Sequence, residues 1–359
     1  MPTRSETLTR ANEVRRYFEQ QGASVVEPPI LQPAETLLDL YGEDIRARAY
    51  VTSDAVRGEQ MLRPDFTVPV VQMHMAEGAE PARYTYAGEV FRRQEDDPTR
   101  SNEYVQVGYE LFDRKDSASA DAEVFALIHG ALAGLNVKAT IGDIGVLTAA
   151  VSGLQTTADR KAALMRHIWR PGRFRALLER FAGRMPVPAS RTALLTGTVS
   201  NKAPLNGVRT QAEIDARIEA LRADAAAPPI SAEQVDQISM LLDIRAPMGL
   251  AITQLQTLAG QMPQIVPAVA GVAARETALR ENGINTDALM FEASYGRTSM
   301  EYYDGFVFGF RALGRDNWPD VATGGRYDAL THRLGEGAEI PAVGGVMRPG
   351  LMLELEAGQ

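Results

Sequence analysis

The residues whose types and spacing could do chemistry lie in one stretch of the chain, from Arg83 to Asp113. Its two runs of alternating residues, RYTYAGEVFRR and EYVQVGYELF, flank a polar segment with a proline, which predicts an antiparallel hairpin with a long loop. On the second strand Gln106, Gly108 and Glu110 share one face. The glycine leaves a bare floor between an amide and a carboxylate roughly 13 Å apart, at about 3.3 Å per residue. A small polar ligand would fit between these two hydrogen-bonding groups.

The first strand of the hairpin adds a cation beside this surface. Gly88 and Arg92 share one of its faces, so a guanidinium stands next to a second patch of bare backbone and could hold an anion. The alternative is an ordinary polar face in contact with solvent, in which the glycines are incidental. The spacing alone leaves both interpretations open.

Composition excludes several other kinds of site. The 359-residue chain has no cysteine, which excludes disulfides, thiol catalysis and cysteine-ligated metals. A net charge of −9 argues against a general nucleic-acid surface, and no P-loop sequence is present. There is no apolar run long enough for a membrane span and no apolar leader, so we expect a cytoplasmic protein. We also expect no metal and no cofactor. The four histidines are scattered without metal-ligand spacing: His74, His129, His167 and His332.

The chain before the hairpin is expected to alternate between helices and strands. Residues 5–20 have the amphipathic pattern of a helix, with Ser5 or Thr7 as its cap and Gly22 at its end. The remaining segments are a strand at 23–32, a short helix at 34–43, and two strands at 49–54 and 59–64.

Asp65 stands between the last of these strands and an apolar helical run at 68–77, which Thr67 and Pro69 open. An acidic residue in this position can cap the helix. It can equally bind a ligand, and the residues alone do not decide between the two roles.

The chain after the hairpin contains a long helical part. Residues 117–135 predict a helix capped by a serine and ended by Gly134, and 137–151 predict a strand followed by a helix. From 153 to 280 alanine, arginine, leucine and glutamate dominate, which indicates a helical insertion, either a partner-binding arm or a solvated subdomain. Strand patterns return at 289–295, 301–313 and 341–347, with a glycine turn at 321–328. Strands on both sides of a helical block predict an α+β domain with a mostly antiparallel sheet.

Five stretches, in this order along the chain, resemble the class II aminoacyl-tRNA synthetases, and specifically histidyl-tRNA synthetase. The hairpin resembles motif 2 of that family. The others are MLRPDFTVPV at 61–70, MEYYDGFVFGF at 300–310, ATGGRYDAL at 322–330 and PAVGGVM at 341–347, which resemble its LRPE-G-T, LDYY and GGRYD segments and the strand that enters motif 3. The resemblance implies one class II synthetase-like core domain over 1–359, with helices flanking the sheet and the insertion at 153–280 inside it.

The resemblance also implies which residues would hold an amino acid. It places the imidazole of a histidine at Glu110 and Tyr303, and the α-ammonium at Asp65, Thr67 and Gln106. Two arginines of motif 2 are retained as well. The full set of candidate ligand-binding residues is Asp65, Thr67, Arg92, Arg100, Gln106, Glu110, Tyr302 and Tyr303.

Two cations that the family uses for adenylate formation are missing. That reaction needs positive groups placed on the triphosphate and on the reacting phosphorus. The arginine ahead of LDYY corresponds to Thr298, and the neighbouring Arg297 would point to the other face of a strand. The arginine of motif 3 corresponds to Leu351, which follows Pro349 in a segment expected to be helical. We also expect no C-terminal anticodon-binding domain, since only 348–359 follow the motif 3 strand.

This pattern resembles the regulatory-subunit family of ATP phosphoribosyltransferase. The resemblance implies no catalytic residues, assembly with a short-form catalytic subunit for the first step of histidine biosynthesis, and feedback regulation by histidine. It also implies a homodimer through the motif 1 region at 23–32, a pocket for free histidine, and no tRNA partner; the 23–32 strand could instead be internal. The alternatives are a histidine-activating ligase or truncated histidyl-tRNA synthetase, and a free-standing histidine sensor.

Overall fold

The structure is a computed structural model that describes residues 2–41, 45–93, 99–197, 207, 209–297 and 302–358. Its main sheet contains the strands β1 (Ser24–Val25), β5 (Ala82–Phe91), β6 (Glu103–Phe112), β7 (Val137–Asp143), β8 (Arg245–Pro247), β9 (Met290–Glu292), β10 (Phe306–Ala312), β11 (Ala322–Arg326) and β12 (Ala342–Met347). In the described ranges these nine strands lie in the order β1-β5-β6-β12-β11-β10-β7-β9-β8. The β1–β5 and β7–β9 pairs are parallel and the others antiparallel. The expected α+β fold with a mostly antiparallel sheet is therefore confirmed.

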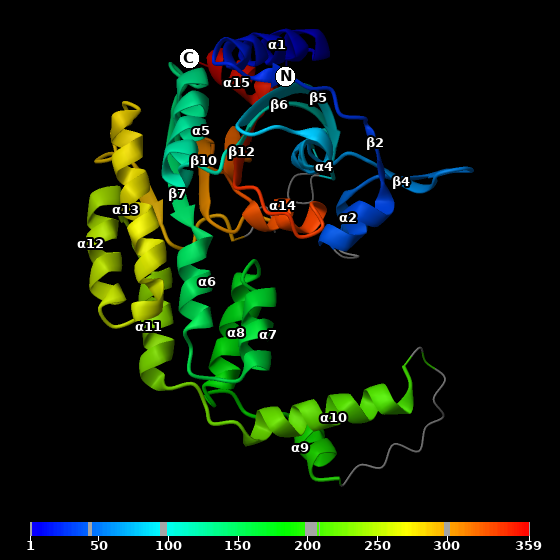
Figure 1. Ribbon diagram of the computed structural model, residues 1–359, viewed down its shortest axis with the longest axis vertical. Helices are drawn as coiled ribbons and strands as arrows, with labels where there is room; N and C mark the ends of the chain where they lie inside the picture. The colour runs from blue at the N-terminus through cyan, green and yellow to red at the C-terminus, as the bar shows by residue number, and fades with distance from the viewer. Residues whose placement is uncertain are drawn as a thin grey trace.

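Helices cover this sheet on both faces (Figure 1). The helices α1 (Arg4–Gln20), α5 (Ser117–Ala131) and α15 (Pro349–Glu356) lie against one face, where Phe18 packs 5.3 Å from the ring of Tyr109. The other face meets α4 (Thr67–Glu77), and α14 (Asp328–Leu334) packs beside α4. Both faces of the hairpin strands are thus buried, which is why Val107, Tyr109 and Leu111 belong to the hydrophobic core.

A small second sheet stands beside the hairpin. It consists of β2 (Leu31–Pro33), β4 (Gly58–Leu62) and β3 (Val51–Asp54), with the short helices α2 (Ala34–Tyr41) and α3 (Ile45–Arg48) next to it. The β3–β4 hairpin confirms the two strands predicted around the turn at 54–58. The segment predicted as a single strand at 23–32 is instead divided, because Pro28 and Pro29 cannot donate to a ladder.

The region 153–280 has two structurally different parts. The helices are α6 (Ile144–Ser152) just before it, and α7 (Ala158–Arg166), α8 (Pro171–Phe181), α9 (Ala189–Leu195), α10 (Gln211–Ala226), α11 (Ala232–Leu242), α12 (Met248–Ala259) and α13 (Val266–Glu281), with a 3₁₀ turn at Pro263–Ile265. Figure 1 shows α7 to α10 extending away from the sheet, whereas α13 returns along α5. Strand β8 of the same region pairs with β9 at the edge of the main sheet.

Several local predictions need correction. The cap of α1 is Thr3, which forms a capping box with Glu6, rather than Ser5 or Thr7. The cap of α5 is Asp116 rather than a serine. Pro349 does not interrupt a helix, because it occupies the first turn of α15, where its missing N–H has no partner to lose.

The glycine-rich segment predicted as a turn at 321–328 is mainly a strand. Its residues Ala322–Arg326 form β11, which pairs with both β10 and β12. Glycine is required here by close packing, since a Cβ on Gly324 would lie 2.2 Å from the ring of Phe308. In the described ranges no helix is both long and apolar enough to cross a membrane.

Candidate functional site

The polar face of β6 is buried rather than exposed to solvent. Gln106 and Glu110 are each only 1% exposed, and they lie beneath α4 and beside β5. The interpretation of this face as an ordinary solvated surface is therefore wrong. Buried polar groups of this kind need hydrogen-bond partners, because an unpaired one costs free energy.

The floor between Gln106 and Glu110 is not bare. Tyr86 faces Gly108 across the hairpin, and a Cβ on Gly108 would lie 2.3 Å from its hydroxyl oxygen. The patch at Gly88 is covered in the same way, since a Cβ there would lie 2.8 Å from a guanidinium nitrogen of Arg63. The glycines thus make room for large side chains from neighbouring elements. The prediction of a bare floor between Gln106 and Glu110 is therefore wrong.

Glu110 is the centre of a cluster of hydroxyl groups. Its Oε1 accepts hydrogen bonds from Thr67 Oγ1 at 3.1 Å and Tyr86 Oη at 2.8 Å, and its Oε2 accepts one from Tyr327 Oη. Gly344 on β12 makes room for this carboxylate, since a Cβ there would overlap Oε2. Within the described ranges Glu110 forms no ion pair, so hydroxyl groups alone stabilise its charge.

Burial raises the pKa of Glu110 to about 7, although the hydrogen bonds from Tyr327, Tyr86 and Thr67 act in the opposite direction. The nearby negative charge of Asp65 also raises this pKa. A carboxylate in this state favours a ligand that brings an N–H donor or a positive charge, because such a ligand stabilises the ionised form.

Other expected ligand-binding residues gather around this carboxylate. Tyr302 Oη lies 3.4 Å from Thr67 Oγ1, and the rings of Tyr302 and Tyr303 are 4.8 Å apart. Gln106 offers a further acceptor: its buried Oε1 has no hydrogen-bond partner among the described residues. Asp65 accepts from the backbone N–H of Val68 at 3.3 Å, so it does contribute to the start of α4. Its negative charge also raises the pKa of Glu110. The geometry is therefore compatible with both predicted roles of Asp65, capping of α4 and ligand binding.

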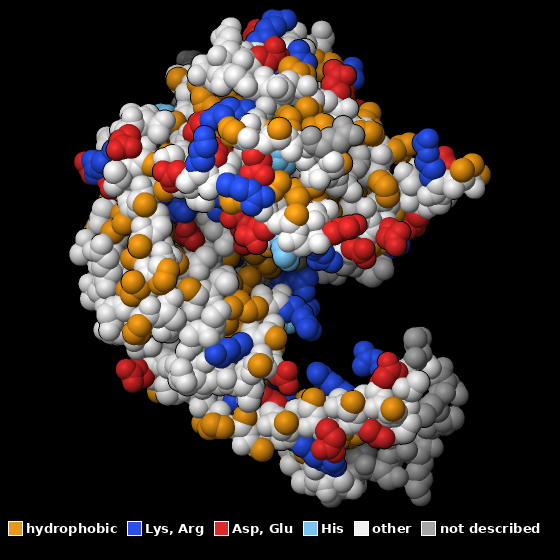
Figure 2. Space-filling model, in the orientation of Figure 1, with side chains coloured by type: hydrophobic (Ala, Val, Ile, Leu, Met, Phe, Trp, Pro, Cys, Tyr) orange, Lys and Arg blue, Asp and Glu red, His pale blue; other side chains and the backbone are white. Residues whose placement is uncertain are grey.

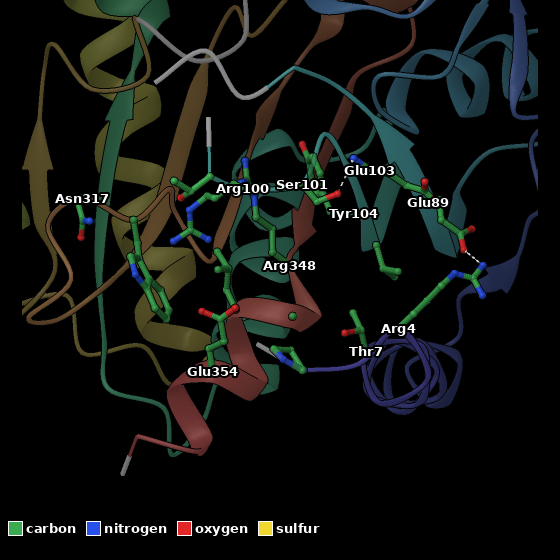
Figure 3. A pocket seen from close by; sticks show the side chains of 16 residues that line it. Arg4, Thr7, Glu89, Arg100, Ser101, Glu103, Tyr104, Asn317, Arg348 and Glu354 are labelled. Atoms are coloured by element: carbon green, nitrogen blue, oxygen red, sulfur yellow. Dashed lines mark hydrogen bonds and ion pairs between the residues drawn. The ribbon is translucent and has the colours of Figure 1, made fainter. Parts of the chain in front are cut away.

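The two retained arginines lie at different distances from this cluster. Arg92 is close enough to lower the pKa of Tyr303, whose pKa burial and Glu110 raise. Arg100 instead lines a separate cavity of about 630 Å³, where its guanidinium lies 5.2 Å from the ring of Trp318 (Figure 3). Arg348 lines the same cavity, and its guanidinium lies 5.0 Å from the ring of Tyr104. The structure therefore does not bring Arg100 to Glu110.

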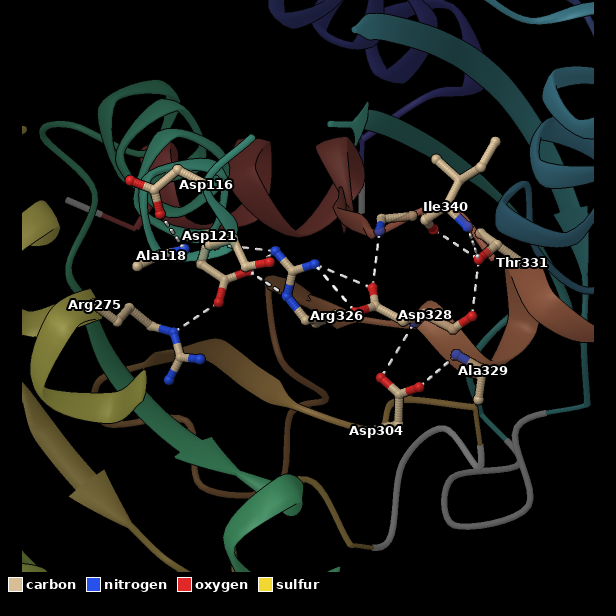
Figure 4. A network of polar contacts seen from close by, with 12 residues as sticks. Asp116, Ala118, Asp121, Arg275, Asp304, Arg326, Asp328, Ala329, Thr331 and Ile340 are labelled. Atoms are coloured by element: carbon tan, nitrogen blue, oxygen red, sulfur yellow. Dashed lines mark hydrogen bonds and ion pairs between the residues drawn. The ribbon is translucent and has the colours of Figure 1, made fainter. Parts of the chain in front are cut away.

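A second buried polar network supports the strand that carries Tyr327. Arg326 binds Asp121 at 2.7 Å and Asp328 at 3.0 Å, and Arg275 of α13 also binds Asp121, at 2.7 Å (Figure 4). Arg275 binds Asp143 as well, at 2.9 Å. Each of these carboxylates is thus paired with a guanidinium. The network joins α5, α13, β7, β11 and the start of α14, and it fixes the backbone immediately before Tyr327.

Asp304 binds the helix that follows this strand. Its carboxylate accepts from the backbone N–H groups of Asp328 and Ala329 at the start of α14 (Figure 4). Burial raises its pKa to about 7. Because Asp304 directly follows Tyr303, this bond ties the tyrosine pair to the end of β11.

Sequence reasoning missed Tyr86 and Tyr327. Tyr86 shares the face of Gly88 on the first strand of the hairpin, so its period-two position was an available signal. Tyr327 lies in the GGRYD segment itself. Thr298, where a catalytic arginine was expected to be missing, lies outside the described residues. The neighbouring Arg297 donates from Nε to the carbonyl of Ile168, in the insertion.

Comparison with known proteins identifies the family of this chain. A family model described as Histidyl-tRNA synthetase matches residues 2–213 and 212–349. The ATP phosphoribosyltransferase regulatory subunit of Brucella anthropi is 30% identical over 355 residues, covering 93% of this chain and 93% of the relative. That of Mesorhizobium japonicum is 31% identical over 360 residues, covering 93% of this chain and 94% of the relative.

Solved structures show the same fold. One is described as an ATP phosphoribosyltransferase regulatory subunit/histidyl-tRNA synthetase from Bacillus halodurans; it has a TM-score of 0.70 and 22% identity and covers 99% of this chain and 80% of its own. A histidyl-tRNA synthetase from Nostoc sp. PCC 7120 has a TM-score of 0.66 and 19% identity and covers 98% of this chain and 72% of its own. The class II synthetase-like fold is therefore confirmed. The chain belongs to the histidyl-tRNA synthetase-like family of ATP phosphoribosyltransferase regulatory subunits.

Proposed function

We propose that this chain is a non-catalytic regulatory subunit that assembles with the catalytic subunit of ATP phosphoribosyltransferase, which performs the first step of histidine biosynthesis. The cluster of polar side chains around Glu110 binds free histidine as the feedback signal. Membership of the regulatory-subunit family supports the assembly. The chemistry of the cluster supports the ligand.

The observation that carries this proposal is a buried carboxylate held by hydroxyl groups, on the same strand face as a buried amide oxygen that has no partner in the part of the chain that the structure describes. Histidine supplies the missing groups. Its imidazole N–H donates to Glu110, beside Tyr303, and its α-ammonium donates to Gln106, Asp65 and Thr67. Both contacts involve a charged group, and such hydrogen bonds are stronger than neutral ones.

The lack of catalysis is proposed from the nucleotide side of the site. Leu351 is an apolar, buried residue of α15 at the position expected for the motif 3 arginine. The purified chain is therefore expected neither to exchange pyrophosphate into ATP in the presence of histidine nor to charge tRNA. Exchange above background would favour the alternative, a histidine-activating ligase.

A homodimer through the N-terminal region is part of the proposal. Val25, Ile30 and Leu31 are large apolar side chains that remain 41%, 43% and 47% exposed around β1 and β2. A second copy could cover them, and self-complementary contacts of this kind form two-fold dimers. Light scattering of the purified chain should give the mass of a dimer, and a monomer at all concentrations would contradict this part of the proposal.

Co-purification tests the assembly itself. A tagged catalytic subunit, expressed together with this chain, should retain it through affinity and size-exclusion steps, and the complex should show phosphoribosyltransferase activity that histidine inhibits. Binding of histidine without retention on the catalytic subunit would indicate a free-standing sensor instead.

A further inference from the structure

The corner between α7 and α8 carries an excess of positive charge in an otherwise acidic chain. From residue 160 to residue 178 the sequence has six Lys and Arg residues and no Asp or Glu, although the net charge of the whole chain is −9. Arg160 is paired with Asp224. Arg166, Arg173 and Arg175 are exposed and form no ion pair with the described residues. Figure 2 shows Lys and Arg side chains gathered where α7 and α8 face the hollow above α10.

The N-terminus of α8 reinforces this charge. Its cap residue is Arg170, which gives no side-chain hydrogen bond to the helix, and its first turn contains no acidic residue. The free N–H groups at a helix N-terminus carry partial positive charge and normally attract carboxylates or phosphates. Here the first turn holds Arg173 instead.

Arg297 provides a second and independent observation. It is only 3% exposed, its guanidinium lies 4.9 Å from the ring of Phe174 in the first turn of α8, and its Nη2 has no hydrogen-bond partner among the described residues. Burial, and then the charge of Arg175, lower the pKa of Arg297 to about 10. A buried cation beside another cation costs free energy unless an anion compensates it.

We propose that this corner, formed by Arg173, Arg175, Arg297 and the N-terminus of α8, binds the phosphate group of a small molecule. Phosphate carries up to two negative charges and accepts several hydrogen bonds, which suits guanidinium forks and helix N–H groups. The ligand is small because Arg297 is recessed beneath the helix, and because the acidic surface elsewhere repels a polyanion. The site uses none of the residues around Glu110 and does not depend on histidine binding.

Calorimetry of the full chain with pyrophosphate tests the proposal. The wild-type chain should bind saturably, and Arg173→Ala and Arg175→Ala should each raise the dissociation constant about tenfold, because each removes a charge-assisted contact. Arg297→Met should remove binding; since it alters a buried residue, its unfolding midpoint is measured in parallel. Arg16→Ala is the matched control, because it removes an exposed arginine of α1 and should bind pyrophosphate as the wild type does.

Two further samples make the result decisive. Arg100→Ala separates this corner from the cavity that Arg100 and Arg348 line: loss of binding in Arg100→Ala, with unchanged binding in Arg175→Ala, would overturn the proposal. A short RNA duplex added as competitor should not displace pyrophosphate, and displacement at equal phosphate concentration would overturn the assignment to a small molecule. Absence of saturable binding in the wild-type chain at millimolar pyrophosphate would also overturn it.

Discussion

Two buried acidic clusters lie on this sheet, and they differ in how their charge is compensated. Asp121 and Asp143 are paired with Arg275 and Arg326. Glu110 is bound by hydroxyl groups alone. The first cluster joins four elements, α5, β7, α13 and β11, and each of its carboxylates has an arginine partner. The second has no ion-pair partner among the residues that the structure describes.

The pKa values follow this difference. Burial raises the pKa of Asp143, but the charge and the hydrogen bond of Arg275 act against it. Burial raises the pKa of Glu110 to about 7, with no arginine among the opposing contributions. We therefore expect the first cluster to stabilise the fold and the second to bind a ligand.

The largest effect is expected in the compensated cluster. Asp121→Ala leaves Arg275 and Arg326 without their shared carboxylate, and removing one member of a buried pair typically costs about 3–5 kcal/mol. Urea unfolding should show a loss of that order. The matched control is Arg245→Ala. Arg245 pairs with Glu292 but its side chain is 70% exposed, so the expected loss in the free energy of unfolding is below about 1 kcal/mol. Similar losses in the two variants would remove the distinction between the clusters.

A smaller effect is expected in the pH dependence of stability. Between pH 4.5 and about 7 the folded chain holds a proton on Glu110 that the unfolded chain has released, so the free energy of unfolding falls as pH rises through this window. A shift of this size corresponds to at most about 3 kcal/mol. Glu110→Gln should show a smaller slope than the wild-type chain; part of the slope remains because burial also raises the pKa of Asp304 to about 7. Urea midpoints measured at about pH 5 and about pH 8 provide the check, and parallel profiles for both proteins would contradict it.

Gln106 allows a test of a single contact in the cluster around Glu110. Gln106→Ala removes one contact to the α-ammonium of histidine and should raise the dissociation constant for histidine by roughly one to two decades. Gln256→Ala, on the exposed side of α12, is the control and should leave it unchanged. Equal affinities in the two variants would mean that the unpaired Oε1 does not face the ligand.

The sequence predicted the elements better than it predicted the contacts between them. Period-two alternation located both hairpin strands, because each strand buries alternate residues on opposite faces. It did not show that Tyr86 covers Gly108, since that contact depends on how the two strands are paired. The first cluster was also invisible to sequence reasoning, because Asp121 and Arg275 are 154 residues apart. Glu110, by contrast, was selected from the motif and its spacing alone, and its role in binding histidine stays a prediction.

The central claim is that Glu110, which forms no ion pair with the residues that the structure describes, accepts a hydrogen bond from the imidazole of histidine. Calorimetry of histidine binding to the purified wild-type chain and to Glu110→Gln at neutral pH tests this most directly, with Glu339→Gln on the exposed surface as the control. The wild-type chain and the control should bind histidine with equal affinity. Glu110→Gln should bind at least about tenfold more weakly, because it removes a charge-assisted acceptor. Equal binding in all three proteins, or no binding in the wild-type chain, would contradict the claim.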